Sequence, residues 1–318
     1  MNPRFAFFMA VAFAGITHAQ PFPSKPVKIL VGSAAGGGTD IISRLLGGKL
    51  QELWGQPVVV ENRTGASASI AADFVAKSPP DGYNVVMAVP NSHTIGPHIM
   101  KLGYDPLLDF TPITLAVQVP HVLVVSANSP LNSMKELVDQ AKANPGKLNF
   151  SSSGIGATQH LAGELFNLVA GVKTVHVPYK GSAAAMQDLM AGVVTMSFDT
   201  TASSIGLIRG GKLKALAVAA PQRAPALPSV PTTAEAGFPG VVMITWYGLF
   251  GPAGMPKALT ERWQQDVAGV LALPDVRERI ASLAGEPGGN PPEEFAAYIR
   301  SEFAKMGKLV KDADVRAE

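Results

Sequence analysis

The feature that most constrains this chain is a repeated order of elements, in which a short apolar strand leads through a loop of small residues into a helix. Residues 27–31 form the first such strand, residues 32–38 form a glycine-rich loop, and apolar residues then recur at helical spacing from Ile41. The same order returns where residues 148–150 lead through residues 151–157 toward Thr158. Because strands that alternate with helices form mainly parallel sheets covered by helices, the sequence predicts an α/β protein.

The rest of the chain continues this alternation. Further strands are predicted over residues 58–60, 84–89, 121–126, 175–177, 193–198 and 213–219. Further helices are predicted over residues 70–76, 134–143, 161–169, 183–191, 257–271 and 292–311. The proline-rich segment 221–239 is expected to be a loop.

Composition narrows the classes of function. The chain has 318 residues, a length that corresponds to about two domains. It has no cysteine, which excludes disulfides, thiolate metal sites and cysteine nucleophiles. With 26 basic and 24 acidic residues the net charge is +2, too small for a protein that binds nucleic acid by charge, so we expect no nucleic-acid partner.

The N-terminus has the pattern of a secretory signal peptide. Arg4 supplies a positive charge, residues 5–16 are apolar, and the small residue Ala19 precedes Gln20. The apolar run is too short for a membrane span, although an uncleaved anchor is the alternative interpretation. We therefore predict that residues 1–19 are removed near Ala19 and that the protein is secreted.

The two glycine-containing loops are candidate anion sites. The start of a helix exposes unpaired N–H groups and the positive end of the helix dipole, and glycine lets the backbone curl around an anion. The carboxyl ends of parallel strands are also where α/β sheets bind ligands. Both loops end in hydroxyl or acidic residues suited to capping the helix, so plain tight turns are the alternative interpretation.

The chain does not match the common sequence motifs of nucleotide-binding proteins, hydrolases or zinc proteases. A Walker A loop needs lysine after Gly37, where this chain has Gly38, and the dinucleotide fingerprint fits Gly154 and Gly156 but has Gln159 at the third glycine position. Neither G-x-S-x-G nor H-E-x-x-H occurs in the chain. We therefore assign no catalytic residue, metal ligand or cofactor.

Several stretches that occur in order point to a family. They are residues 33–40, 61–65 with 80–83, 109–112, 154–166 (GIGATQHLAGELF) and 177–181 (VPYKG). Together they resemble the Bug family, the substrate-binding proteins of tripartite tricarboxylate transporters. The resemblance covers essentially the whole chain after the signal peptide, and its specificity comes from the ordered set rather than from any single stretch.

The resemblance implies a two-lobed fold of the type II periplasmic-binding-protein kind. Each lobe has a mixed β-sheet flanked by helices, and the ligand lies in the cleft between the lobes. Lobe 1 combines residues 20–120 with residues 243–318, and lobe 2 is residues 121–242. The resemblance also implies a monomer that captures a small carboxylate and delivers it to the membrane subunits of a transporter.

The resemblance further implies that backbone amides of the two loops bind the carboxylate. The ligand-binding residues expected from the first loop are Ala35, Gly36, Gly37, Gly38, Thr39 and Asp40, and those from the second are Gly154, Gly156, Ala157, Thr158 and Gln159. Asp199 matches an acidic position near a polar group of the ligand. Apart from the resemblance, Asn91 follows a predicted strand and is expected to line the cleft. We add Ser67 to these candidates because the chain departs from the family pattern there.

Several roles stay open at this stage. The stretch NRTGASASIAADF replaces the more usual NRPGAGGNIGA, so the serines at 67 and 69 add bulk and hydroxyl groups that either narrow the pocket or suit a different distal group. Thr158 either contacts the ligand or caps its helix, and Asp40 either caps its helix or holds the loop. The ligand is a dicarboxylate, an aromatic acid or an amino acid. A sensor for carboxylates, and a secreted hydrolase on the same fold, are the alternative functions.

Overall fold

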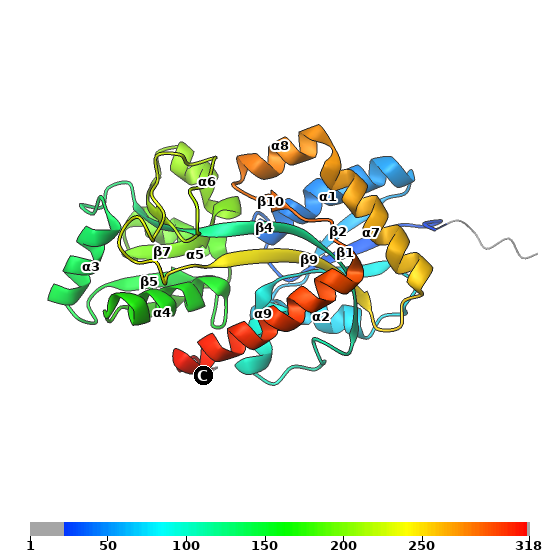
Figure 1. Cartoon of the computed structure of the whole chain (residues 1–318), viewed down its shortest axis with the longest axis horizontal. Helices are drawn as coiled ribbons and strands as arrows, with labels where there is room; N and C mark the ends of the chain where they lie inside the picture. Colours follow the sequence, from blue (N-terminus) through cyan, green and yellow to red (C-terminus); the bar gives the residue numbers. More distant parts are fainter. Residues whose placement is uncertain (1–21, 317–318) are drawn as a thin grey trace, which may run out of the picture.

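The structure, a computed structural model, describes residues 22–316. The predicted signal peptide lies outside the described residues, as does the cleavage point near Ala19. One long mixed sheet runs through the molecule in the order β2-β1-β3-β9-β4-β7-β5-β6, and helices cover it (Figure 1). The α/β fold with a mixed sheet flanked by helices is thus confirmed.

The first half of the sheet is built from the three N-terminal strands and from β9, which comes from much later in the chain. Its strands are β1 (Val27–Val31), β2 (Val58–Asn62), β3 (Asn84–Ala88) and β9 (Ile244–Pro252). Strand β1 pairs in parallel with β2 and β3, and β9 lies antiparallel to β3. The helices here are α1 (Gly38–Trp54), α2 (Ser69–Ala76), α7 (Lys257–Ala272), α8 (Pro274–Ser282) and α9 (Pro292–Asp312).

The second half of the sheet repeats this plan with central residues. Its strands are β5 (Asn149–Ser152), β6 (Val175–Pro178), β7 (Met196–Thr200) and β8 (Leu213–Val218). Strand β5 pairs in parallel with both β6 and β7. The helices are α3 (Met134–Ala143), α4 (Thr158–Ala170), α5 (Ser182–Ala191) and α6 (Thr201–Arg209).

Strand β4 (Phe110–Ser126) joins the two halves. It pairs with β9 up to Pro120, which lies opposite Ile244, and from His121 onward it pairs with β7. Figure 1 shows β4 and β9 side by side across the middle of the molecule. The chain changes from one half-sheet to the other at these two strands, and the predicted lobe boundaries at residues 120 and 242 stay a prediction.

The predicted strand over residues 121–126 is too short, because β4 already begins at Phe110. Proline cannot donate to a β-ladder, so Pro112 and Pro120 read as strand breakers in the sequence. The strand accommodates the first of them at a β-bulge, where the register with β9 shifts between Pro112 and Thr114. Helices α6 and α8 and the two-residue strand β10 (Glu286–Pro287) are not predicted from the sequence.

Helix α9 packs against both halves of the molecule. Near its start, Phe295 lies 4.9 Å from the ring of Phe250 on β9. Near its end, Val310 belongs to the buried cluster that also contains Leu161 and Phe166 of α4. A single helix therefore shares the apolar cores of both half-sheets.

Within residues 22–316, no helix combines the length and the apolar character that a membrane span requires.

Candidate functional site

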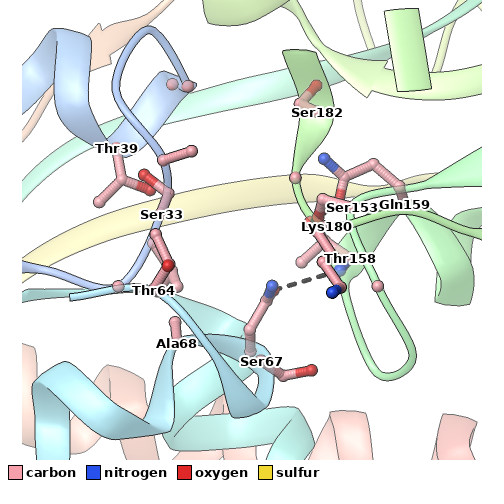
Figure 2. A pocket seen from close by; sticks show the side chains of 18 of the residues that line it. Ser33, Thr39, Thr64, Ser67, Ala68, Ser153, Thr158, Gln159, Lys180 and Ser182 are labelled. Atoms are coloured by element: carbon pink, nitrogen blue, oxygen red, sulfur yellow. Dashed lines mark hydrogen bonds between the residues drawn. The ribbon is translucent and has the colours of Figure 1, made fainter. Parts of the chain in front are cut away.

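The main cleft of the molecule has a volume of about 590 Å³ and lies between the two half-sheets. Figure 2 shows Ser33, Thr39 and Thr64 on the wall formed by the first half, opposite Ser153, Gln159 and Ser182 on the wall formed by the second half. The cleft lies at the carboxyl ends of the parallel strands β1, β5, β6 and β7, since the segments that follow these strands line it. This is the position at which open α/β sheets bind ligands.

Four helices begin at this cleft. Gly38 of α1, Thr158 of α4 and Ser182 of α5 all line it, as does Ser203 in the first turn of α6. None of these four helices has a side-chain cap. Because the first N–H groups of a helix have no partner within the helix, several donors and four positive dipole ends converge on one cavity.

Neither Asp40 nor Thr158 caps its helix, so of the alternatives left open by the sequence the capping ones are excluded. Helix α1 is capped by Gly37 and helix α4 by Ala157, whose side chains offer no hydrogen bond. The hydroxyl of Thr158 instead lies 3.1 Å from that of Thr245 on β9, and its backbone N–H donates to Asn91 across the cleft. The start of α1 thus has no side-chain cap, whereas the first N–H group of α4 is already paired with Asn91.

Asp40 holds the first loop from behind. Its carboxylate accepts hydrogen bonds from the backbone N–H of Gly36 at 3.0 Å, from the amide of Asn62 at 2.9 Å and from the guanidinium of Arg44. Burial alone would raise the pKa of Asp40, but the hydrogen bonds from Arg44, Gly36 and Asn62 together hold it below its ordinary value. The carboxylate therefore stays ionised and fixes the curl of the loop.

Asp199 holds the second half of the site by hydrogen bonds, as Asp40 holds the first loop. It is fully buried, and its carboxylate accepts hydrogen bonds from the amide of Gln159 at 3.1 Å, from Ser182 at 2.6 Å and from Ser203 at 2.8 Å. The backbone N–H of Thr200 also donates to it at 2.9 Å. All four donating residues line the cleft, whereas Asp199 itself lies behind them.

Charge and unpaired polar groups in the cleft favour an anion. Among the described residues that line it, Lys180 is the sole charged one, and no acidic side chain does so. Figure 2 places Lys180 on the wall with Ser153 and Thr158. The buried hydroxyl of Ser33 lines the opposite wall and finds no hydrogen-bond partner among the described residues.

Nine of the fourteen residues expected at the site line the cleft. They are Ala35, Gly37, Gly38, Thr39, Ser67, Asn91, Gly154, Thr158 and Gln159. The other five do not line it: Gly36, Asp40, Gly156, Ala157 and Asp199. Of these, Gly36 donates to Asp40 and Gly156 donates to His160, so both support the loops.

Most of the second wall is not expected from the sequence, because only Gly154, Thr158 and Gln159 are predicted among its thirteen lining residues. The additional polar lining residues are Ser33, Thr64, Ser153, Lys180, Ser182, Thr200, Ser203, Thr245 and Tyr247. The segments after β6 and β7 could have been predicted to line the cleft from the strand-to-helix order that identified the first two loops. This order is harder to recognise there, because α5 begins after a loop of only three residues and α6 follows β7 directly.

His160 and His176 support the second loop from the side away from the cleft. Their rings stack with centroids 3.7 Å apart, and the Ser152 hydroxyl lies 2.6 Å from Nε2 of His176. Burial lowers the pKa of His160 to about 4, and burial together with the neighbouring His160 lowers that of His176 to about 3. Both rings are neutral at ordinary pH and serve as packing and hydrogen-bond supports.

Within residues 22–316, no three His, Cys, Asp or Glu side chains are grouped as metal ligands.

Comparison with known proteins agrees with this geometry. A family profile described as "Tripartite tricarboxylate transporter family receptor" matches residues 42–315. The UPF0065 protein in the tcbD-tcbE intergenic region of Pseudomonas sp. (strain P51) is 38% identical, over 98% of this chain and 93% of that protein. The structure of R. palustris Rpa4515 with adipate has a TM-score of 0.90 at 35% identity and covers 93% of this chain and 99% of its own. That of MatC from Rhodopseudomonas palustris with bound malate has a TM-score of 0.86 at 31% identity and covers 91% and 100%.

Proposed function

The chain belongs to the tripartite tricarboxylate transporter receptor family, whose members are periplasmic solute-binding proteins, and from this membership we propose that it captures a small dicarboxylate in its cleft. The bound ligand is then delivered to the membrane subunits of a transporter. The proposal includes no catalytic step, and it assigns the chain to the periplasm after removal of residues 1–19.

The observation that supports this proposal is the convergence of four helix starts, none capped by the side chain of its own N-cap residue, on a cleft that no acidic side chain of the described residues lines. Hydrogen bonds to a charged group contribute about 1.5–3 kcal/mol each. Four of them, after the cost of ordering the ligand, correspond to about 8 kcal/mol, which is a micromolar affinity. Backbone amides alone therefore suffice for a useful receptor.

Two further observations support a ligand with two carboxylates. Two structural neighbours hold adipate and malate, which both carry two carboxylate groups. In this chain, Lys180 adds a full positive charge to the wall that also carries the starts of α4 and α5. One carboxylate occupies the helix starts and the other lies near Lys180.

Isothermal calorimetry on the purified chain tests the proposal. The panel holds dicarboxylates of increasing length, matched monocarboxylates, aromatic acids and amino acids. We expect micromolar binding of at least one dicarboxylate and recovery of the ligand unchanged by mass spectrometry. If no compound in the panel binds, the proposal is contradicted. If the ligand is converted to another compound, the protein is an enzyme.

We predict that Lys180→Met weakens dicarboxylate binding by about tenfold, the value of one charge-assisted hydrogen bond. Binding of the monocarboxylate of the same length should change little, because it has no group for Lys180 to pair with. Calorimetry with both ligands measures the difference. Lys173→Met is the matched control, since it removes the same charge from an exposed residue that does not line the cleft. Equal losses for both ligands would contradict this role.

A further inference from the structure

An unusual turn lies at one end of the cleft. Ala66, Ser67 and Ala68 have φ angles of 43°, 52° and 72°, so three successive residues with side chains adopt the left-handed conformation. That conformation is unfavourable for any residue with a Cβ atom, and such strain persists only where the surroundings impose it. The turn departs from the glycine-containing sequence that the family pattern leads one to expect.

The turn is held in place by close packing. A Cβ atom on Gly32, at the end of β1, would overlap the side chain and backbone of Ala68, so the two segments lie in direct contact. The N–H of Ala68 also donates to the carbonyl of Gly65 at 3.0 Å. These contacts leave Ser67 at the tip of the turn, and it lines the cleft.

Ser67 bridges the two walls of the cleft. Its hydroxyl donates a hydrogen bond to the backbone carbonyl of Ile155, which belongs to the loop between β5 and α4. Both residues line the cleft, and Figure 2 shows Ser67 reaching from the first wall toward the loop that carries Thr158. Since the bridge joins opposite walls by a direct contact, no ligand atom passes between Ser67 and Ile155.

The space behind this bridge is apolar. A Cβ atom on Gly156 would lie 3.9 Å from the Ser67 hydroxyl, but also 3.0 Å from Ile99 and 4.0 Å from Ile95. Ile95 is fully buried, and Met100 lines the cleft nearby. The Ser67 bridge thus separates the cleft from the aliphatic side chains of Ile95 and Ile99.

We propose that Ser67 sets the maximum length of the ligand by closing this end of the cleft. The inference rests on the proposed function and specifies its substrate: short dicarboxylates bind, and longer ones are rejected because their methylene groups meet the bridge. Opening the bridge uncovers Ile99, which together with Met100 of the cleft lining is suited to contact an aliphatic chain.

The test compares the dissociation constants of succinate and suberate for three variants. In Ser67→Gly the bridge and the bulk are both removed, and in Ser67→Ala the hydroxyl alone is removed. We expect the ratio of the suberate to the succinate constant to fall by about tenfold in Ser67→Gly, the effect of burying two methylene groups, and by less in Ser67→Ala. Ala66→Gly is the matched control, because it relaxes the same turn but keeps the hydroxyl, and its ratio should match the original chain.

The outcomes separate the two proposals. An unchanged ratio in Ser67→Gly, with succinate binding intact, overturns the role of Ser67 and leaves the proposed function standing. A shift of the ratio in Ala66→Gly as large as in Ser67→Gly overturns it too, since backbone strain would then be the cause. Absence of binding of every carboxylate by the original chain and by all variants overturns the proposed function. Thermal melts establish that each variant is folded.

Discussion

Gly38→Ala is expected to weaken dicarboxylate binding by about a hundredfold while the chain remains folded. Gly38 is the first residue of α1, and a Cβ atom there would overlap the hydroxyl of Tyr247 and lie 3.1 Å from that of Thr200. Tyr247 is 1% exposed and its ring belongs to a buried apolar cluster, so we expect the start of α1 to shift instead. Losing two hydrogen bonds to a carboxylate costs about 3 kcal/mol or more, which is about a hundredfold in affinity.

The chain offers a matched control in the same helix. Gly48 is exposed on α1, and a Cβ atom there would meet nothing within 4 Å. Gly48→Ala should bind ligand normally and gain about 0.5–1 kcal/mol of stability, because alanine is a better helix former. Calorimetry measures the affinity of both variants, and thermal melts measure their stability. Equal affinities for the two would mean that the start of α1 does not hold the ligand.

Asp199→Ala is expected to lower both stability and affinity, although Asp199 does not line the cleft. The fully buried carboxylate orients Gln159, Ser182 and Ser203, and its removal leaves their donors unpaired. The free energy of unfolding should fall by about 3 kcal/mol, the cost of stranding several buried polar groups. Affinity should fall by more than about tenfold, since even one lost hydrogen bond to a charged group has that effect.

Comparison of ligands distinguishes a positioning role from direct contact. If Asp199 acts through its neighbours, dicarboxylates with and without an amino group lose affinity equally. A loss confined to ligands with an ammonium group would show that Asp199 contacts the ligand. Asp139→Ala on the exposed face of α3 serves as the control and should change stability by no more than about 0.5 kcal/mol.

The regular elements follow well from the sequence because their signals are local. The apolar run at Val27–Val31 and the amphipathic, capped segment Met134–Ala143 are found where the pattern predicts them. Ser133 accepts a hydrogen bond from the N–H of Glu136 and so marks the start of that helix. The glycine loops likewise indicate where the cleft lies, since loops after parallel strands meet at one edge of the sheet.

The rest of the site depends on contacts that no local pattern contains. Lys180 and Ser203 reach the cleft because β5 lies between β6 and β7, an order set by the assembled sheet. Asp199 reads as a residue at the end of a strand, and its hydrogen bonds become visible only when α4, α5 and α6 are in place. Ser67 reads as either a ligand contact or a helix cap, but it lies in a left-handed turn whose next residue, Ala68, packs against Gly32.

The position of α9 also limits how the two halves can move. If β4 and β9 were the only connections, the two halves could open widely by a hinge motion in which these two strands bend. Here the far end of α9 is embedded beside α4, with Val310 and Val315 in the same apolar cluster as Leu161. Any change in the angle between the halves must therefore slide the end of this helix across its neighbour, and packed helices slide easily over only small distances. Helix α9 therefore restrains how far the cleft opens. Ending the chain before Met306 would remove this restraint.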